Sequence, residues 1–261
     1  LKGGDKKNLS LLIDTLGGLS KKEINLLRIR SEKNVILKKN LDSLQFAWEK
    51  HLRTSTPIEY LSGISYWRNL KLKVSNKVLI PRSETELIIE IVSNIFSNNE
   101  RKIFFADLGT GSGAISIALA LANQNWYGVA TDIDNNALEI ASQNFKNHSK
   151  KSNLKFFCGN WWDPLKDFKG ELDFAVANPP YIPKDVYKQL PIEVKNYEPR
   201  IALLGGEDGL DHIREIIYKS PLYLKEKGWL IIENHFDQGG RIKKLFFENG
   251  FKSVKILKDL S

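Results

Sequence analysis

From residue 101 onward, short apolar runs typical of buried strands alternate with longer runs typical of helices. Examples of the first kind are "KIFFADLG" and "LDFAVAN", and an example of the second is "NNALEIASQNF". A chain with this pattern forms a mostly parallel sheet that helices cover on both faces. The predicted fold class is therefore α/β, and ligands are expected at the carboxyl ends of the strands.

The same pattern predicts where the elements lie. We expect strands over 102–109, 127–132, 154–159, 172–178 and 228–233, with a last strand over 251–257. Helices are expected over 83–96, 114–122, 135–145, 209–224 and 238–250. Residues 83–261 are thus predicted to form one domain.

The first 82 residues differ from this domain. Residues 1–54 predict a small helical domain, in which Leu37, Leu41, Leu44 and Trp48 step by four, three and four onto one helix face. Residues 55–82 predict a linker with a short β-hairpin, because "ISYWRNLKLKVSNKVLIPR" alternates between apolar and polar residues before it reaches its proline.

Composition and charge limit the cellular location and the kinds of partner that we expect. No window approaches eighteen uninterrupted apolar residues, so we expect a soluble cytoplasmic protein without a membrane segment. The net charge of +8 admits nucleic acid as a partner, but the lysines are scattered, which favours an ordinary solvated surface and no sequence-specific nucleic-acid binding. Cys158 is the single cysteine, which excludes an internal disulfide; we expect it to be buried in a strand.

A glycine-rich stretch, "DLGTGSGAI" at residues 107–115, follows the first predicted strand of the sheet. Alternate glycines let the backbone turn tightly and approach a ligand, which the start of the next helix then faces. The pattern alone fits a nicotinamide cofactor or S-adenosylmethionine. Asp107 favours S-adenosylmethionine, because a carboxylate there would repel a pyrophosphate and suits the cationic methionine end. The predicted cofactor-binding residues here are Asp107, Gly109, Thr110, Gly111, Ser112 and Gly113.

The next two strand ends carry further candidates. Asp132 ends the second strand, where a carboxylate can accept hydrogen bonds from both hydroxyls of a ribose, and Asp134 is expected to cap the following helix. Two tryptophans follow the third strand; Trp161 is the better candidate for the wall of an adenine pocket, and Trp162 for the core. The four histidines are dispersed without metal-ligand spacing, so we expect no metal site.

The fourth strand runs into "NPPY" at residues 178–181. Adjacent prolines stiffen the chain and lack backbone donors. The side-chain oxygen of Asn178 and the carbonyl of Pro179 can each accept one N–H of an –NH2 group, while Tyr181 lies against its plane. Holding both hydrogens would direct the delocalised lone pair at a sulfonium methyl group. The predicted catalytic residues are Asn178, Pro179, Pro180 and Tyr181, and Asn178 is also a predicted cofactor contact.

Together, "DLGTGSGAI" and "NPPYIP" resemble the class I S-adenosylmethionine-dependent methyltransferases that act on exocyclic or amide nitrogen. Three more segments, "TPIEYLSG", "VLIPRSETE" and "NYEPRIALLGGEDGLDHIREII", make the chain similar to HemK-type glutamine-N5 methyltransferases of peptide chain release factors from about residue 55 to about residue 240. This resemblance implies a Rossmann-like domain, S-adenosylmethionine as methyl donor, and methylation of the glutamine in the Gly-Gly-Gln motif of class 1 release factors. It also implies that the N-terminal helices dock the release factor.

The resemblance assigns roles to individual residues. In that family the asparagine and first proline of the motif hold the glutamine amide, which corresponds to Asn178 and Pro179, and the tyrosine corresponds to Tyr181. The glycine-rich loop, the acid of the second strand and the tryptophan after the third strand contact the cofactor. These correspond to Gly109 through Gly113, Asp132 and Trp161. We expect a monomer.

Three other functions remain open from the residues alone. Adenine N6 and guanine N2 are also planar –NH2 groups, so a nucleic-acid methyltransferase could use the same motif. A non-catalytic module that binds S-adenosylmethionine and scaffolds translation factors is a second alternative, although it would have no physical need for Asn178, Pro179 and Tyr181. A nicotinamide dehydrogenase is a third, disfavoured by the lack of a histidine near a strand end that could relay a proton.

Overall fold

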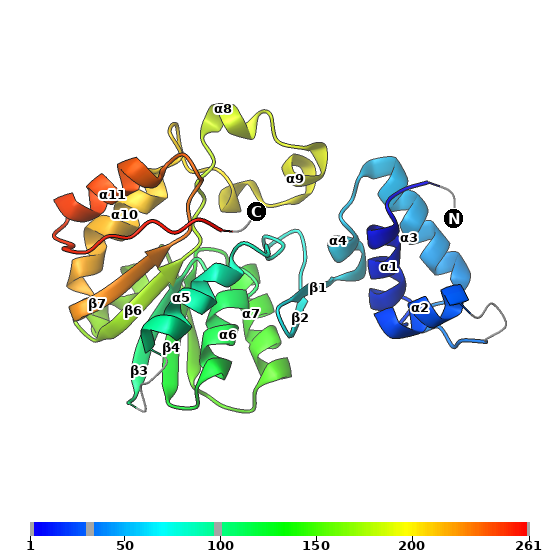
Figure 1. Ribbon diagram of the computed structural model, residues 1–261, viewed down its shortest axis with the longest axis horizontal. Coiled ribbons are helices and arrows are strands. Elements are labelled where there is room, and N and C mark those ends of the chain that lie inside the picture. The colour runs from blue at the N-terminus through cyan, green and yellow to red at the C-terminus, as the bar shows by residue number, and fades with distance from the viewer. Residues whose placement is uncertain (1–2, 30–33, 97–100, 260–261) are drawn as a thin grey trace.

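The computed structural model describes residues 3–29, 34–96 and 101–259, and a five-stranded parallel sheet forms its centre (Figure 1). The strands are β3 (Ile103–Leu108), β4 (Trp126–Asp132), β5 (Leu154–Cys158), β6 (Leu172–Ala177) and β7 (Leu224–Ile232). Their order is β5-β4-β3-β6-β7, so the direction of winding reverses between β3 and β6. Ligands of open α/β sheets bind at such a switch point. The predicted α/β class is confirmed.

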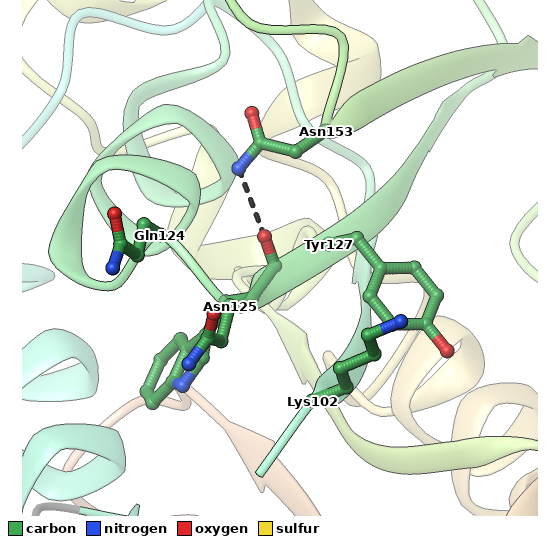
Figure 2. A pocket seen from close by; sticks show the side chains of 6 residues that line it. Lys102, Gln124, Asn125, Tyr127 and Asn153 are labelled. Carbon is green, nitrogen blue, oxygen red and sulfur yellow. Dashed lines mark hydrogen bonds between the residues drawn. The ribbon is translucent and has the colours of Figure 1, made fainter. Parts of the chain in front are cut away.

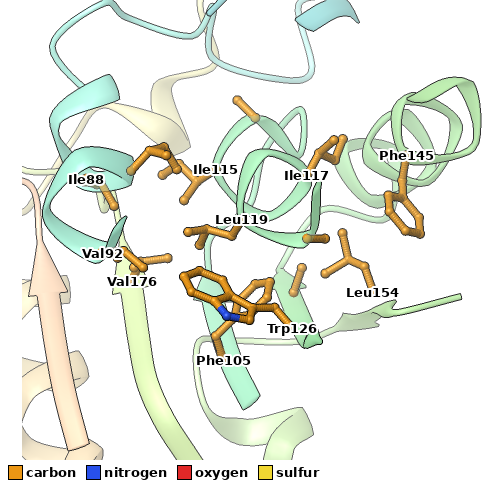
Figure 3. Packing of buried hydrophobic residues seen from close by; sticks show 14 of the residues in the cluster. Ile88, Val92, Phe105, Ile115, Ile117, Leu119, Trp126, Phe145, Leu154 and Val176 are labelled. Carbon is orange, nitrogen blue, oxygen red and sulfur yellow. The ribbon is translucent and has the colours of Figure 1, made fainter. Parts of the chain in front are cut away.

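Helices cover both faces of the sheet. One face carries α5 (Glu86–Phe96), α6 (Ala114–Ala122) and α7 (Asn135–His148), and the other carries α10 (Asp211–Lys219) and α11 (Gly239–Glu248). Successive strand side chains point to opposite faces. Along β3, Phe105 therefore lies in the cluster under α5 and α6, whereas Phe104 lies in the cluster under α10. Figure 3 shows the first cluster, where side chains of α5 and α6 meet over Phe105 and Trp126.

The N-terminal helices pack around a core of their own. They are α1 (Lys6–Thr15), α2 (Lys21–Ile29), α3 (Leu41–Thr54) and α4 (Ile58–Ser62). Leu12, Leu44 and Trp48 are buried at their centre, and the unit lies beside the sheet rather than on it (Figure 1). The expected helix face included Leu37 and Leu41, and both expectations were wrong. Leu37 lies before α3 and not on it, and Leu41 is 66% exposed, because it is the first residue of α3 and no preceding turn covers it.

A β-hairpin joins the two parts, as predicted. Its strands, β1 (Ile64–Trp67) and β2 (Leu70–Lys73), pair antiparallel, and Leu72 is fully buried in the core under α6. Asn144 of α7 holds the hairpin edge, because its Oδ1 accepts from the Lys73 amide (2.7 Å) and its Nδ2 donates to the Lys73 carbonyl (3.0 Å). The hairpin is therefore anchored to the sheet domain.

Short helical turns occupy the longer connections: η1 (Asp163–Phe168), α8 (Lys184–Tyr187), α9 (Ile192–Tyr197), η2 (Arg200–Ala202) and η3 (Ser220–Leu222). The connection from β6 to α10 contains α8, α9 and η2. Its Tyr197 hydroxyl donates to the carbonyl of Thr54 at the end of α3 (2.6 Å). This connection thus touches the N-terminal helices as well as the sheet.

Two further expectations were wrong. Residues 251–259 contain no strand; Phe251 and Val254 pack on the second core cluster, but Ile256 is half exposed, so the apolar run reflects packing and not sheet pairing. Cys158 is exposed, because it is the last residue of β5, which is an edge strand. Within the described ranges, no helix is long and apolar enough to cross a membrane.

Candidate active site

The glycine-rich loop leaves the carboxyl end of β3 at the switch point of the sheet. Gly109 and Gly113 both have positive φ, at 75° and 84°. A β-carbon on Gly109 would lie 2.8 Å from the Trp161 ring, and one on Gly113 would lie 2.9 Å from Ile117. Only glycine fits either position without displacing a neighbour. At Gly111 a β-carbon would meet nothing within 4 Å, so the loop has open space on that side.

Asp107 lies beneath this loop and is fully buried. Its Oδ2 accepts from the Thr110 hydroxyl (2.6 Å) and from the Ser116 amide (3.1 Å), whereas its buried Oδ1 has no partner in the described chain. Burial raises the pKa of Asp107 to about 6, against the lowering effect of these hydrogen bonds. Asp107 therefore shapes the loop from below, and its predicted contact with the cofactor stays a prediction.

The side chains of Thr110 and Ser112 are also buried. The Thr110 hydroxyl lies 2.7 Å from that of Ser116, and the Ser112 carbonyl accepts from Asn144 (2.9 Å). The backbone amide of Ser112 donates no hydrogen bond within the described residues. Any contact of Ser112 with a cofactor is thus available to its backbone and not to its side chain.

Asp132 lies beside the glycine-rich loop at the end of β4. Its Oδ2 accepts from the Gly111 amide (2.9 Å), and its Oδ1 accepts from the Asp134 amide (3.0 Å). Burial raises the pKa of Asp132, and the two amides lower it. Asp134 caps α7 as predicted, because its side chain accepts from the Asn136 amide.

The two tryptophans after β5 have different surroundings. Trp161 packs over Gly109 with only 8% of its surface exposed, and its buried indole N–H has no acceptor in the described chain. Trp162 is fully buried, stacks on Tyr223 with ring centroids 4.7 Å apart, and donates to the carbonyl of Ile216 (3.0 Å). Trp162 is therefore a core residue, and Trp161 lies beside the candidate cofactor loop.

The "NPPY" motif follows β6, next to β3 at the switch point. The Asn178 side chain donates from Nδ2 to the Thr85 hydroxyl (3.1 Å). Pro179 and Pro180 are buried, and no described residue donates to the Pro179 carbonyl. The Tyr181 hydroxyl donates to Glu233 (3.2 Å), and burial raises the pKa of Tyr181. The motif thus has two acceptors available, the Asn178 oxygen and the Pro179 carbonyl.

Two residues behind the motif, Thr85 and Glu233, are absent from the sequence prediction of the site. Glu233 follows β7, and its Oε2 is buried without a partner in the described chain. Burial raises the pKa of Glu233, while the neighbouring polar groups of Thr85, Tyr181 and Asn178 lower it; of these, the Tyr181 hydroxyl donates to Oε1 (3.2 Å). Glu233 could have been found by the rule that identified Asp132, since each is an acid at the carboxyl end of a strand. Thr85 lies in the "PRSETE" segment, which served only as a family signature.

The segment that carries Thr85 meets a second family segment at an ion pair whose acid is buried. Arg82 of "VLIPRSETE" and Glu198 of "NYEPR" form a 2.5 Å contact, and the Glu198 side chain is almost fully buried. Burial raises the pKa of Glu198, and Arg82 lowers it. The Arg82 carbonyl also accepts from the Trp67 indole (2.6 Å). The pair therefore fastens the segment that carries Thr85 to the connection that follows the motif.

A surface hollow of about 310 Å³ lies at the other end of the strands, and Figure 2 shows the side chains that line it. Its lining consists of Lys102, Gln124, Asn125, Trp126, Tyr127 and Asn153. Among them, the Asn153 Nδ2 donates to the carbonyl of Trp126 (2.8 Å). These residues precede or begin β3, β4 and β5, so the hollow lies at the amino ends of the strands, away from the motif. No group of metal-ligating side chains occurs in the part of the chain that is described.

Comparisons with known proteins agree with this geometry. Residues 84–190 match the family model "Methyltransferase small domain". The release factor glutamine methyltransferase of Prochlorococcus marinus is 39% identical over 260 residues, covering 99% of this chain and 89% of that protein. The release factor glutamine methyltransferase of Coxiella burnetii is 38% identical over 217 residues, covering 82% of this chain and 75% of that protein.

Solved structures share the fold at low identity. The hMettl16 catalytic domain superposes with a TM-score of 0.57 at 17% identity, covering 95% of this chain and 85% of that one. A SAM-dependent methyltransferase from Agrobacterium tumefaciens gives a TM-score of 0.51 at 14% identity, with coverages of 69% and 54%. The predicted Rossmann-like methyltransferase fold is thereby confirmed, and so is the resemblance carried by the motifs. The chain belongs to the release factor glutamine methyltransferase family.

Proposed function

We propose that this protein transfers a methyl group from S-adenosylmethionine to the side-chain amide nitrogen of the glutamine in the Gly-Gly-Gln motif of class 1 release factors. The membership of its family supports the reaction and the acceptor. The observation that carries the proposal is the hydrogen bonding of the Asn178 side chain. Its Nδ2 is bonded to Thr85, so its oxygen is left as an acceptor beside the Pro179 carbonyl.

These two oxygens suit a primary amide. Each can accept one N–H of the glutamine side chain, and the Tyr181 ring can lie against the amide plane. An amide nitrogen is a poor nucleophile because its lone pair is delocalised. Fixing both hydrogens directs that lone pair along one line, so the motif acts through orientation and electrostatics. In the net change the nitrogen gains the methyl group as the bond from that group to the sulfonium sulfur breaks, S-adenosylhomocysteine is left as the product, and the nitrogen releases one proton to solvent.

The residues around the glycine-rich loop fit S-adenosylmethionine. Asp132 offers carboxylate oxygens that can accept from ribose hydroxyls. The backbone at Gly111 borders open space, and the Trp161 ring can pack against the adenine. The buried Asp107 oxygen without a partner supports a contact with the cationic methionine end, directly or through water. When bound, S-adenosylmethionine supplies a sulfonium methyl group to a nucleophile.

The N-terminal helices, residues 1–54, are proposed to dock the release factor. A hollow of about 380 Å³ on α3 supports this role, because its lining combines the exposed apolar residues Phe46 and Leu52 with the charged residues Glu49, Lys50 and Arg53. Such a mixed patch is typical of protein interfaces. We further propose a cytoplasmic monomer that binds no nucleic acid sequence-specifically, because its substrate is a translation factor.

The proposal is tested by methyl transfer from labelled S-adenosylmethionine. The acceptors are a class 1 release factor, its Gly-Gly-Ala variant, and duplex DNA or ribosomal RNA in parallel. Label on the intact factor and none on its variant would support both reaction and acceptor. Label on nucleic acid alone would keep the –NH2 chemistry and overturn the acceptor. Cofactor binding without label on any acceptor would favour a non-catalytic scaffold.

A further inference from the structure

Three segments far apart in the sequence meet behind the acceptor motif. Thr85 lies just before α5, Asn178 just after β6, and Glu233 just after β7. The Glu233 amide donates to the carbonyl of Ala177 (3.0 Å), which fixes the end of β7 against the end of β6. A carboxylate, a hydroxyl and a side-chain amide are thus held together at the site where the glutamine amide is proposed to bind.

The hydrogen-bonding capacity of Asn178 decides which way its side chain faces. A side-chain amide is planar, with its acceptor oxygen at one edge of the group and its two N–H donors at the other. The donors of Asn178 are turned to Thr85 (3.1 Å), so the oxygen faces the opposite side. If the amide were flipped, it would present donors to a substrate amide whose own donors need acceptors. The orientation of Asn178 therefore matters as much as its presence.

Thr85 can enforce this orientation only if its own hydrogen is used elsewhere. A hydroxyl has one hydrogen, and it accepts best when that hydrogen is donated to another group. Glu233 can accept this hydrogen, because its Oε2 is buried without a partner in the described chain and the neighbouring Thr85 lowers its pKa. The order of donation therefore runs from Asn178 to Thr85 and from Thr85 to Glu233.

Glu233 has the burial and the available oxygen that this arrangement needs. One of its oxygens accepts from the Tyr181 hydroxyl (3.2 Å), and the other is buried without a partner in the described chain. Burial raises its pKa and so does the neighbouring Glu84, whereas the three donors around it favour the anion. As the acceptor nitrogen gains positive charge during methyl transfer, a carboxylate behind Asn178 also stabilises that charge.

We propose that Thr85 and Glu233 are positioning residues of this enzyme: Glu233 binds the Thr85 hydroxyl, Thr85 binds the Asn178 side chain, and the Asn178 oxygen is thereby held toward the acceptor amide. This inference rests on the proposed function, since it concerns the same methyl acceptor. Within the described residues, neither side chain forms a hydrogen bond with the glycine-rich loop. Their loss should therefore act on the transfer step and not on cofactor binding.

The experiment compares Thr85→Val, Thr85→Ser and Glu233→Gln in the full chain. We measure kcat and KM with a class 1 release factor, the S-adenosylmethionine Kd by calorimetry, and the thermal unfolding midpoint. Thr85→Val should lower kcat by about 10- to 100-fold with the Kd within about twofold, because misorientation at a reacting centre has effects of this size. Thr85→Ser keeps the hydroxyl and should restore kcat to within about threefold of the wild-type value. Glu233→Gln should lower kcat by about 10-fold and reduce its dependence on pH between about 5 and 8.

Matched controls remove similar groups elsewhere. Ser220→Ala deletes a buried hydroxyl that donates to the Ile217 carbonyl, and Glu248→Gln neutralises an acid on α11; both should keep wild-type kcat. Wild-type kcat in Thr85→Val or in Glu233→Gln would overturn the inference and leave the proposed function standing. Equal losses of kcat and cofactor affinity would also overturn it, because they indicate a general structural role. Absence of transfer by the wild-type protein would instead refute the proposed function itself.

Discussion

The indole ring of Trp161 occupies the space that a β-carbon on Gly109 would need, since such an atom would lie 2.8 Å from the ring. The tryptophan itself has a φ of 43°, in the left-handed region that residues other than glycine rarely adopt. Gly109 after β3 and Trp161 after β5, both with positive φ, thus pack against each other. This contact places the ring beside the candidate cofactor loop.

Gly109→Ala should therefore weaken S-adenosylmethionine binding by about 10-fold or more, because the new methyl group displaces Trp161 and strains the loop. Titration calorimetry measures the effect. The control is Gly170→Ala, since Gly170 has a similar φ of 70° but nothing within 4 Å of its β-carbon position. Gly170→Ala should lose about 1 kcal/mol of stability from its positive φ alone, and Gly109→Ala should lose more because its methyl group also clashes with Trp161. Equal cofactor affinity in the two would contradict the role of the Trp161 contact.

Asn178→Ala should reduce methyl transfer to a release factor by about 100-fold or more, because one of the two acceptors for the substrate amide is lost. S-adenosylmethionine binding should persist within about threefold, since the cofactor is held mainly by other residues. Single-turnover kinetics and calorimetry give the two quantities. A parallel loss of transfer and cofactor affinity would show that Asn178 does not act on the acceptor.

Asp132→Ala should weaken cofactor binding first, by about 10- to 100-fold, because hydrogen bonds to a charged acceptor contribute about 1.5–3 kcal/mol each. The matched variant is Asp134→Ala, which removes the cap of α7 and should cost about 1 kcal/mol of stability. Calorimetry and urea unfolding on both proteins separate the two effects. The assignment of Asp132 fails if Asp134→Ala weakens cofactor binding more than Asp132→Ala does.

Asp107 should make stability depend on pH. Burial raises its pKa to about 6 from 3.8, so the folded state holds the proton more tightly than the unfolded state. The stability contributed by this proton is present below pH 4 and is lost as the pH rises through 6. The Asp107→Asn variant has no proton to lose at this position, so its stability relative to the wild type should rise by about 2 kcal/mol between pH 4 and pH 7.5.

Urea unfolding at the two pH values measures this difference. The control is Asp167→Asn, whose side chain is exposed and whose variant should track the wild type. The same pH dependence in the wild type and in Asp107→Asn would contradict the buried, proton-binding state of Asp107.

Arg82→Met should destabilise the protein by about 2 kcal/mol at pH 8, because it leaves the buried Glu198 carboxylate without its cation. Loss of Arg82 also raises the pKa of Glu198 further, so the carboxyl is protonated at a higher pH. The penalty should therefore shrink toward pH 5. Urea unfolding at both pH values tests this, and adding Glu198→Gln should recover part of the loss. A penalty independent of pH would exclude the charge as its cause.

Much of the sheet domain could be predicted from the sequence, because strands buried on both faces read as continuous apolar runs. The hairpin and the cap of α7 were also predictable from local pattern. The run over 251–257 was not, since apolar alternation reports which side chains pack and not whether the backbone pairs with a neighbour. Cys158 was misjudged because the place of β5 at the sheet edge depends on strand order.

Some residues of the candidate site could likewise be predicted from the sequence and others could not. Asn178, Asp132 and the glycine-rich loop stand out because their residue types are unusual at strand ends. Thr85 and Glu233 do not, because a threonine before a helix and an acid after a strand are common. Their significance depends on the hydrogen bond from Asn178 and on burial, and both arise only when α5, β6 and β7 are brought together.

The hydrogen bond from Tyr197 to the Thr54 carbonyl joins the two parts of the molecule. The connection that begins at the acceptor motif is tied to the last residue of α3, so the span between the N-terminal helices and the methyl-acceptor position is set by the fold. If those helices dock the partner, as proposed, the distance in the substrate between its docking surface and its methyl-accepting glutamine must match this span. An isolated Gly-Gly-Gln peptide supplies the reacting group without that second point of attachment, and the enzyme would then discriminate its substrate by size and shape as well as by chemistry.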